Sequence, residues 1–170
     1  MLSNQPVLIV LLAMSLTGSS SALAGSCTES SRSGTAGTAS KPKAETVVKN
    51  LMTSEVVRVE IFRGDSSTPK LSKFLKPGEE GGYTESISKN GGKAEVRIQL
   101  HAESARIAPE CKYIVRNTGD DEMVWKLPDG VTDVCPGSDQ SAVPFKVACD
   151  KGFNSDKLRY RTHLTLTDRQ

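Results

Sequence analysis

Two stretches in which apolar and polar residues alternate strictly constrain the fold of this chain more than any other feature. In the first stretch every second residue is apolar, and these residues are Ala94, Val96, Ile98, Leu100 and Ala102. The same period returns near the end of the chain, where one face consists of Leu158, Tyr160, Thr162, Leu164 and Leu166. Successive side chains of a β-strand point to opposite faces of a sheet, so both stretches predict strands with one buried face.

Shorter runs with strand character lie between turn residues along the rest of the chain, at residues 57–61, 83–88, 112–116, 123–127 and 145–149. Seven to eight short strands with frequent turns predict an all-β fold, an antiparallel β-sandwich with Ig-like architecture. We expect residues 45–170 to form this single domain. Trp125 lies between Cys111 and Cys149, as in immunoglobulin domains. At least three predicted strands precede Cys111, however, and Val147 stands where a corner tyrosine is expected, so membership of that family is not predicted.

Three local patterns add detail to this architecture. Asn90-Gly91 precedes the first alternating stretch and predicts a hairpin, because both residues tolerate a positive φ. Residues 117–121 predict a second hairpin loop. Between residues 45 and 53, apolar residues recur at helical spacing and predict a short N-terminal helix, although the adjacent Val47 and Val48 also suit a strand.

The first 24 residues contain no Asp, Glu, Lys or Arg and include a ten-residue apolar run at residues 7–16. Such a run is too short to span a hydrocarbon core of about 30 Å as a helix. Small residues separated by one position, Ala22 and Ala24, follow it, as the site of a signal peptidase requires. We therefore predict a signal peptide over residues 1–24 and a mature protein that is secreted or periplasmic.

Residues 25–44 are rich in Ser, Thr, Gly and Lys and contain almost no apolar side chain. They cannot bury enough surface to offset their ordering entropy, so a disordered tail is expected. Cys27 lies in this segment and invites a lipid anchor. Leu23 sits one place too early for a lipidation signal, however, so ordinary secretion is the stronger expectation.

Four cysteines remain after the leader, and an even number in an exported chain predicts disulfides with three alternative pairings. Cys135 and Cys149 flank a segment rich in Pro, Gly and Ser, and we favour this pair. Cys111 with Cys135 is the main rival. Cys27 is expected to have no obligatory partner.

The strongest candidate for a binding surface is a row of basic residues on the polar face of the last predicted strand. We call this row the basic strip; its members are Lys157, Arg159, Arg161 and His163. Alternate residues of a strand lie about 6.6 Å apart, so the row could bind an anionic polymer, extended by Arg97 and His101 if their strand were adjacent. The more expected alternative is a terminal edge strand whose Lys and Arg prevent aggregation.

Composition and motifs exclude several function classes. A formal net charge of +2 lacks the basic excess of a nucleic-acid-binding protein. No catalytic, metal or phosphate-binding motif is found, so we expect no cofactor and no enzymatic activity. The sequence predicts an exported binding or accessory protein at the cell envelope or beyond, recognising a protein or an anionic polymer through loops or an edge strand. The alternative is a small secreted hydrolase that uses His101 or His163 as its base.

Overall fold

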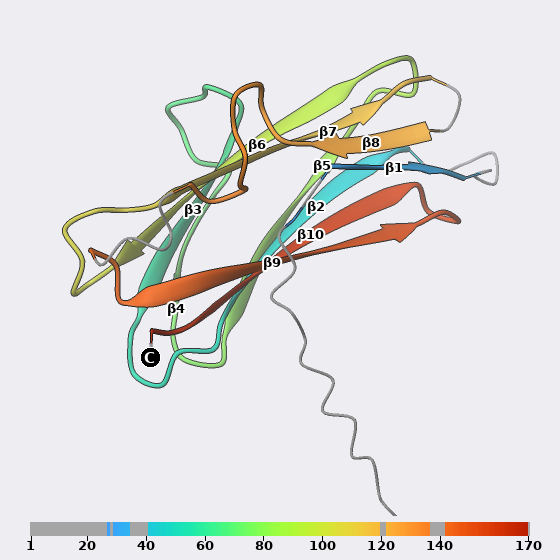
Figure 1. The fold of residues 1–170 in the computed structure, drawn as a ribbon. Helices are drawn as coiled ribbons and strands as arrows, with labels where there is room; N and C mark the ends of the chain where they lie inside the picture. Colours follow the sequence, from blue (N-terminus) through green and yellow to red (C-terminus); the bar gives the residue numbers. More distant parts are fainter. Residues whose placement is uncertain (1–26, 28, 35–40, 120–121, 137–141, 170) are drawn as a thin grey trace, which may run out of the picture.

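The computed structural model of the chain describes residue 27 and residues 29–34, 41–119, 122–136 and 142–169, and it shows a sandwich of two β-sheets (Figure 1). The predicted β-sandwich is therefore confirmed. The described residues form ten strands, which are β1 (Ser30–Ser33), β2 (Lys43–Asn50), β3 (Val57–Arg63), β4 (Leu71–Leu75), β5 (Glu80–Ser86), β6 (Lys93–Ala102), β7 (Glu110–Asn117), β8 (Glu122–Lys126), β9 (Phe145–Asn154) and β10 (Arg159–Asp168). No helix among the described residues has the length and apolarity that crossing a bilayer requires.

The strand order explains which segments face one another. One sheet has six strands in the order β1-β8-β7-β6-β3-β4, and the other has four in the order β5-β2-β10-β9. Every pairing is antiparallel except that of β2 with β10, which is parallel. Strand β10 therefore lies inside the four-stranded sheet, and the expectation of a terminal edge strand is wrong.

The segment in which we expected a short helix is strand β2. It lies between β10 and β5 in the four-stranded sheet, so both of its edges are paired. Val48 is fully buried in the core, and Val47, which points to the opposite face, is only 6% exposed. Burial on both faces removes the alternation that would have revealed a strand.

The expected disordered tail is partly ordered. Residues 30–33 of this segment form β1, which pairs with β8 through Ser30 opposite Trp125. Cys27 is buried and covalently bonded, and β2 already begins at Lys43. The polar composition concealed this order because a disulfide, rather than apolar burial, holds the segment in place. The predicted signal peptide lies outside the described residues.

Of the two predicted hairpins, one is confirmed. Strands β7 and β8, on either side of residues 117–121, pair antiparallel. The hairpin at Asn90-Gly91 is wrong, because this turn joins β5 of the four-stranded sheet to β6 of the six-stranded sheet. Gly91 does adopt a positive φ of 77°, and the buried side chain of Asn117 donates hydrogen bonds to the carbonyls of Ser88 and Lys89 nearby. The turn residues were recognised correctly; their topological role was not.

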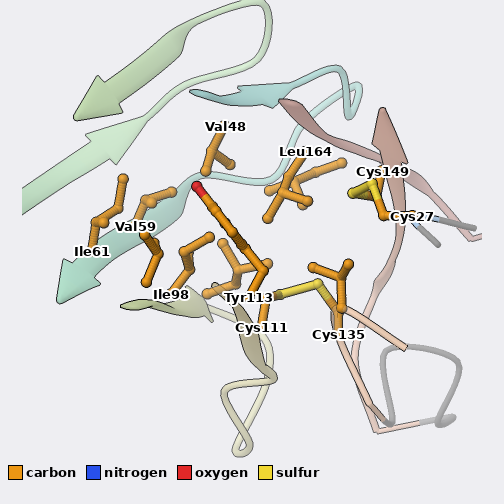
Figure 2. Packing of buried hydrophobic residues seen from close by; sticks show 14 of the residues in the cluster. Cys27, Val48, Val59, Ile61, Ile98, Cys111, Tyr113, Cys135, Cys149 and Leu164 are labelled. Atoms are coloured by element: carbon orange, nitrogen blue, oxygen red, sulfur yellow. A yellow bond between two sulfur atoms is a disulfide. The ribbon is translucent and has the colours of Figure 1, made fainter. Parts of the chain in front are cut away.

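The disulfides join Cys27 to Cys149 and Cys111 to Cys135 (Figure 2). The favoured pair of Cys135 with Cys149 is therefore wrong, and its rival is correct. Cys135 is held against β7 because the Lys112 amide donates a 2.6 Å hydrogen bond to the carbonyl of the preceding Val134. Since a lipid anchor needs the sulfur that Cys27 shares with Cys149, the disulfide and the anchor exclude each other.

A small polar network lies inside the apolar core. Trp125 and Tyr113 are buried and stacked, with ring centroids 5.7 Å apart. The Trp125 Nε1 donates a 2.8 Å hydrogen bond to Oγ1 of the fully buried Thr162. Tyr113 is hydrogen-bonded to Thr46, and burial raises the pKa of its hydroxyl to about 12 although hydrogen bonds to Thr46 and Thr162 oppose this rise. Together these bonds tie β7 and β8 of one sheet to β2 and β10 of the other.

Replacing Thr162 with Val is expected to lower the free energy of unfolding by about 2 kcal/mol, because the indole N–H loses its acceptor inside the core. Urea denaturation followed by Trp125 fluorescence measures this change. Thr165→Val provides the matched control on the same strand, at an outward-facing position, and should stay within about 0.5 kcal/mol of the parent. Equal effects of the two substitutions would contradict the assigned role of the hydrogen bond.

Candidate functional site

The basic strip lies on the outer face of the four-stranded sheet. Tyr160, Thr162 and Leu164 of β10 are buried between the sheets, so the residues that alternate with them face outward. Arg161 is exposed and Arg159 half-buried. Lys157 is exposed in the turn between β9 and β10. Three of the four predicted cations are thus brought together at one end of the sheet.

One carboxylate lies between the two arginines. Glu45 of β2 is opposite Arg161 in the parallel register, and its Oε2 is 3.3 Å from Nε of Arg161 and 3.6 Å from Nη1 of Arg159. A single negative charge is therefore shared by two guanidinium groups. With Lys157, which forms no ion pair among the described residues, the group carries three positive charges and one negative charge. The excess of two is available to an anion.

A shallow depression of about 310 Å³ opens beside these charges and is lined by Glu45, Gly152, Phe153, Asn154, Lys157, Arg159 and Arg161. Gly152 of β9 lies opposite Arg161 in the antiparallel register. A Cβ at Gly152 would have no atom within 4 Å, so the space beside the Arg161 guanidinium is open. Any larger residue would project a side chain into that space. The glycine therefore leaves a path by which an anionic group can reach the guanidinium.

His163 does not share this depression. It lies two positions beyond Arg161 along β10, between Asp150 of β9 and Val47 of β2. Its Nε2 is buried and has no hydrogen-bond partner among the described residues. The predicted strip is therefore reduced to its three cations Lys157, Arg159 and Arg161, with His163 beside them.

The outer face of the six-stranded sheet is a useful contrast, because its charges neutralise one another. Glu110 pairs with Arg97 at 3.1 Å and with Lys112 at 2.6 Å. Although partial burial raises the pKa of Glu110, hydrogen bonds from Lys112, Gln99 and Arg97 hold it below its usual value. A depression of about 390 Å³ on this face is lined by cations that mostly have carboxylates beside them. This face also contains Arg97 and His101, so they do not extend the basic strip.

Of the two histidines, His101 lies beside a carboxylate in the described part of the chain. Nε2 of His101 lies 3.0 Å from Oε2 of Glu60 on neighbouring strands. Ser72 donates its hydroxyl to the same Glu60 at 3.4 Å. The carboxylate thus stands between the serine and the histidine, whereas a catalytic triad needs the histidine in the middle to take the serine proton. Among the described residues, no three His, Cys, Asp or Glu side chains converge as metal ligands would.

A second polar site, which sequence analysis missed, lies where β9 meets the edge of the six-stranded sheet. We call it the edge pocket; it has a volume of about 350 Å³ and is lined by Ser30, Arg32, Lys151, Phe153 and Tyr160. Lys151 alternates with Cys149 and Phe153 on the inward face of β9, where an apolar residue is the rule. This lysine at an inward-facing position was the one feature of the sequence that could have indicated the site. The opposing wall belongs to β1, which composition had assigned to a disordered tail.

No protein-family model matches this chain, and no curated protein is significantly similar to it in sequence.

Proposed function

We propose that this chain is an exported, non-enzymatic binding protein that recognises an anionic polymer of the cell envelope or its surroundings through the basic strip. The observation that carries the proposal is the open depression at Gly152, where Arg159 and Arg161 share one carboxylate and Lys157 has none. Since β10 is an interior strand, protection of a sheet edge does not account for its arginines. A rigid sheet with excess positive charge in a shallow hollow suits an extended polyanion.

The proposed location rests on the disulfides. Two disulfides indicate an oxidising compartment outside the cytoplasm. Secretion or residence in the periplasm is the finer proposal, supported by the apolar leader at residues 7–16. An anionic polymer is a partner that an exported protein can meet outside the cytoplasm, and binding it requires no cofactor.

Two other functions receive less support from the geometry. A protein partner could add a strand to the free edge of β9, but the inward-facing Lys151 is of the kind that discourages edge pairing. A hydrolase using His101 or His163 would need a serine or cysteine beside the imidazole. Ser72 hydrogen-bonds to Glu60 rather than to His101, and Nε2 of His163 has no hydrogen-bond partner in the described residues.

The R159A/R161A double variant is expected to elute from a heparin column at clearly lower salt than the parent, with affinity reduced about tenfold or more. The local charge falls from +2 to zero, because Lys157 then faces an unpaired Glu45. Retention measured over a NaCl gradient at neutral pH gives the comparison.

The matched control is K93A/R116A, which removes the same formal charge from neighbouring positions of β6 and β7 on the other sheet. Its retention should stay close to that of the parent. If both double variants lost retention equally, binding would follow net charge alone. If R159A/R161A were retained as strongly as the parent, the basic strip would not be the surface that binds the polyanion.

A further inference from the structure

We infer that the edge pocket binds a single acidic sugar residue, with Lys151 and Arg32 contacting its acidic group and Phe153 contacting its ring. This inference deepens the proposed function and rests on it for the choice of an anionic carbohydrate as the ligand. The pocket lies beside the basic strip, because Phe153 lines both the edge pocket and the depression at Gly152. A polymer along the strip can therefore place one unit around the sheet edge.

The position of the Lys151 ammonium group is fixed by its neighbours. Its Nζ lies 4.4 Å from the centroid of the Trp125 ring and donates a 3.3 Å hydrogen bond to Oγ of Ser30. Tyr160 is hydrogen-bonded to the same Ser30 through both the hydroxyl and the carbonyl group, the latter at 3.2 Å. These contacts hold three polar side chains at one wall of the pocket before any ligand binds.

The lining of this pocket contains two cations and no carboxylate. Among the described residues, neither Lys151 nor Arg32 forms an ion pair, whereas most cations of the outer sheet faces do. Burial lowers the pKa of Lys151 and the nearby Arg32 lowers it further, while Asp150 and Glu29 act in the opposite direction without reversing the shift. A bound anion would offset both the burial and the repulsion from Arg32, because it would place a negative charge directly beside the Lys151 ammonium group. Charged residues such as Lys151 and Arg32 suit the edge strands β9 and β1, but the two hydroxyl groups that fix the Lys151 ammonium group do not serve to protect an edge.

The aromatic wall distinguishes a sugar from a bare anion. Phe153 and Tyr160 lie with ring centroids 5.4 Å apart and planes inclined at 44°. Tyr160 is buried and supports the partly exposed Phe153, whose ring provides an apolar surface next to the cations. An inorganic anion would leave that surface uncovered. A sugar ring that carries a carboxylate can place its C–H face on the Phe153 ring, its hydroxyls near Ser30, and its charge near Lys151 and Arg32.

The disulfide from Cys27 to Cys149 holds the two walls of the edge pocket together. Cys27 precedes the first pocket residue of β1 by three positions, and Cys149 precedes Lys151 by two on the same inward face of β9. The pocket therefore exists in the oxidised protein, which is the form expected outside the cytoplasm.

Titration of the oxidised protein with glucuronate, followed by backbone amide NMR, tests this inference. We expect shifts at Lys151 and Phe153 with a Kd on the order of 1 mM, as suits a ligand of this size. Glucose, which lacks the carboxylate, should cause no saturable shift at these residues. K151M, which keeps the length and apolar stem of the side chain, should raise the Kd tenfold or more. R32A, at an exposed position that leaves the core untouched, should raise it severalfold.

The R159A/R161A variant separates the inference from the proposed function. It should bind glucuronate as the parent does while losing heparin. If both K151M and R32A bound glucuronate as the parent does, or if glucose caused the same shifts, the edge pocket would not be a site for an acidic sugar. Neither result would affect the proposal that the basic strip binds an anionic polymer. Absence of any glucuronate shift in the folded parent would overturn it as well.

Discussion

Replacing both Cys27 and Cys149 with Ala is expected to lower the free energy of unfolding by about 5 kcal/mol, the largest loss that any single cross-link in this protein should give. The two cysteines are 122 residues apart, so their bond restricts almost the whole unfolded domain. Loop-closure entropy grows with the logarithm of that separation. Urea denaturation of the oxidised variant, followed by circular dichroism and by Trp125 fluorescence, measures the loss.

The second disulfide provides the matched control. Cys111 and Cys135 are only 24 residues apart, so C111A/C135A should lose about 3.5 kcal/mol by the same loop-closure relation. Both variants remove two buried sulfurs, and the difference between them isolates the effect of loop length. A loss below 1 kcal/mol for C27A/C149A would show that β1 separates from the domain without unfolding the rest of it.

Replacing Trp125 with Ala is expected to lower the free energy of unfolding by about 4–5 kcal/mol. The side chain is fully buried, stacks on Tyr113, donates a hydrogen bond to Thr162 and lies beneath the ammonium group of Lys151. Its removal opens a large cavity and leaves polar groups of both sheets without partners. Because Trp125 is the only tryptophan, circular dichroism rather than fluorescence must follow the unfolding of this variant.

Phe74→Ala provides the control for aromatic truncation. Phe74 lies on edge strand β4 and is 61% exposed, so its loss should change the free energy of unfolding by no more than about 0.5 kcal/mol. A similar loss for both variants would mean that the contacts of Trp125 do not hold the sheets together.

The fold was predictable from sequence wherever a strand buries one face. The period-two patterns at residues 94–102 and 158–166 identified β6 and β10, and the apolar residues of both are buried as expected. Side-chain alternation is a local property, and the sequence displays it directly.

Features that depend on distant partners could not be predicted in this way. Val47 and Val48 of β2 are both buried, and the two strands that flank this segment, β5 and β10, are distant from it in the sequence. The order of β1 depends on a bond from Cys27 to a residue 122 positions away. A turn sequence such as Asn90-Gly91 specifies how the backbone bends but not which sheet the next strand joins.

The candidate site also combines features that follow from a local pattern with features that depend on distant partners. Alternation placed Arg159 and Arg161 on one face, and their outward position follows from that pattern. Their shared carboxylate comes from Glu45 on a parallel strand that the sequence did not identify as a neighbour. The edge pocket needed both the order of β1 and the inward direction of Lys151, so no local pattern could have assembled it.

The central proposal, recognition of an anionic polymer at the basic strip, is tested most directly by amide NMR of the mature, oxidised protein titrated with a heparin-derived oligosaccharide. We predict salt-sensitive shifts at Gly152, Arg159 and Arg161, and none at Lys93 or Arg116 on the opposite sheet. Shifts confined to the six-stranded sheet, or a spectrum that does not change, would contradict the proposal.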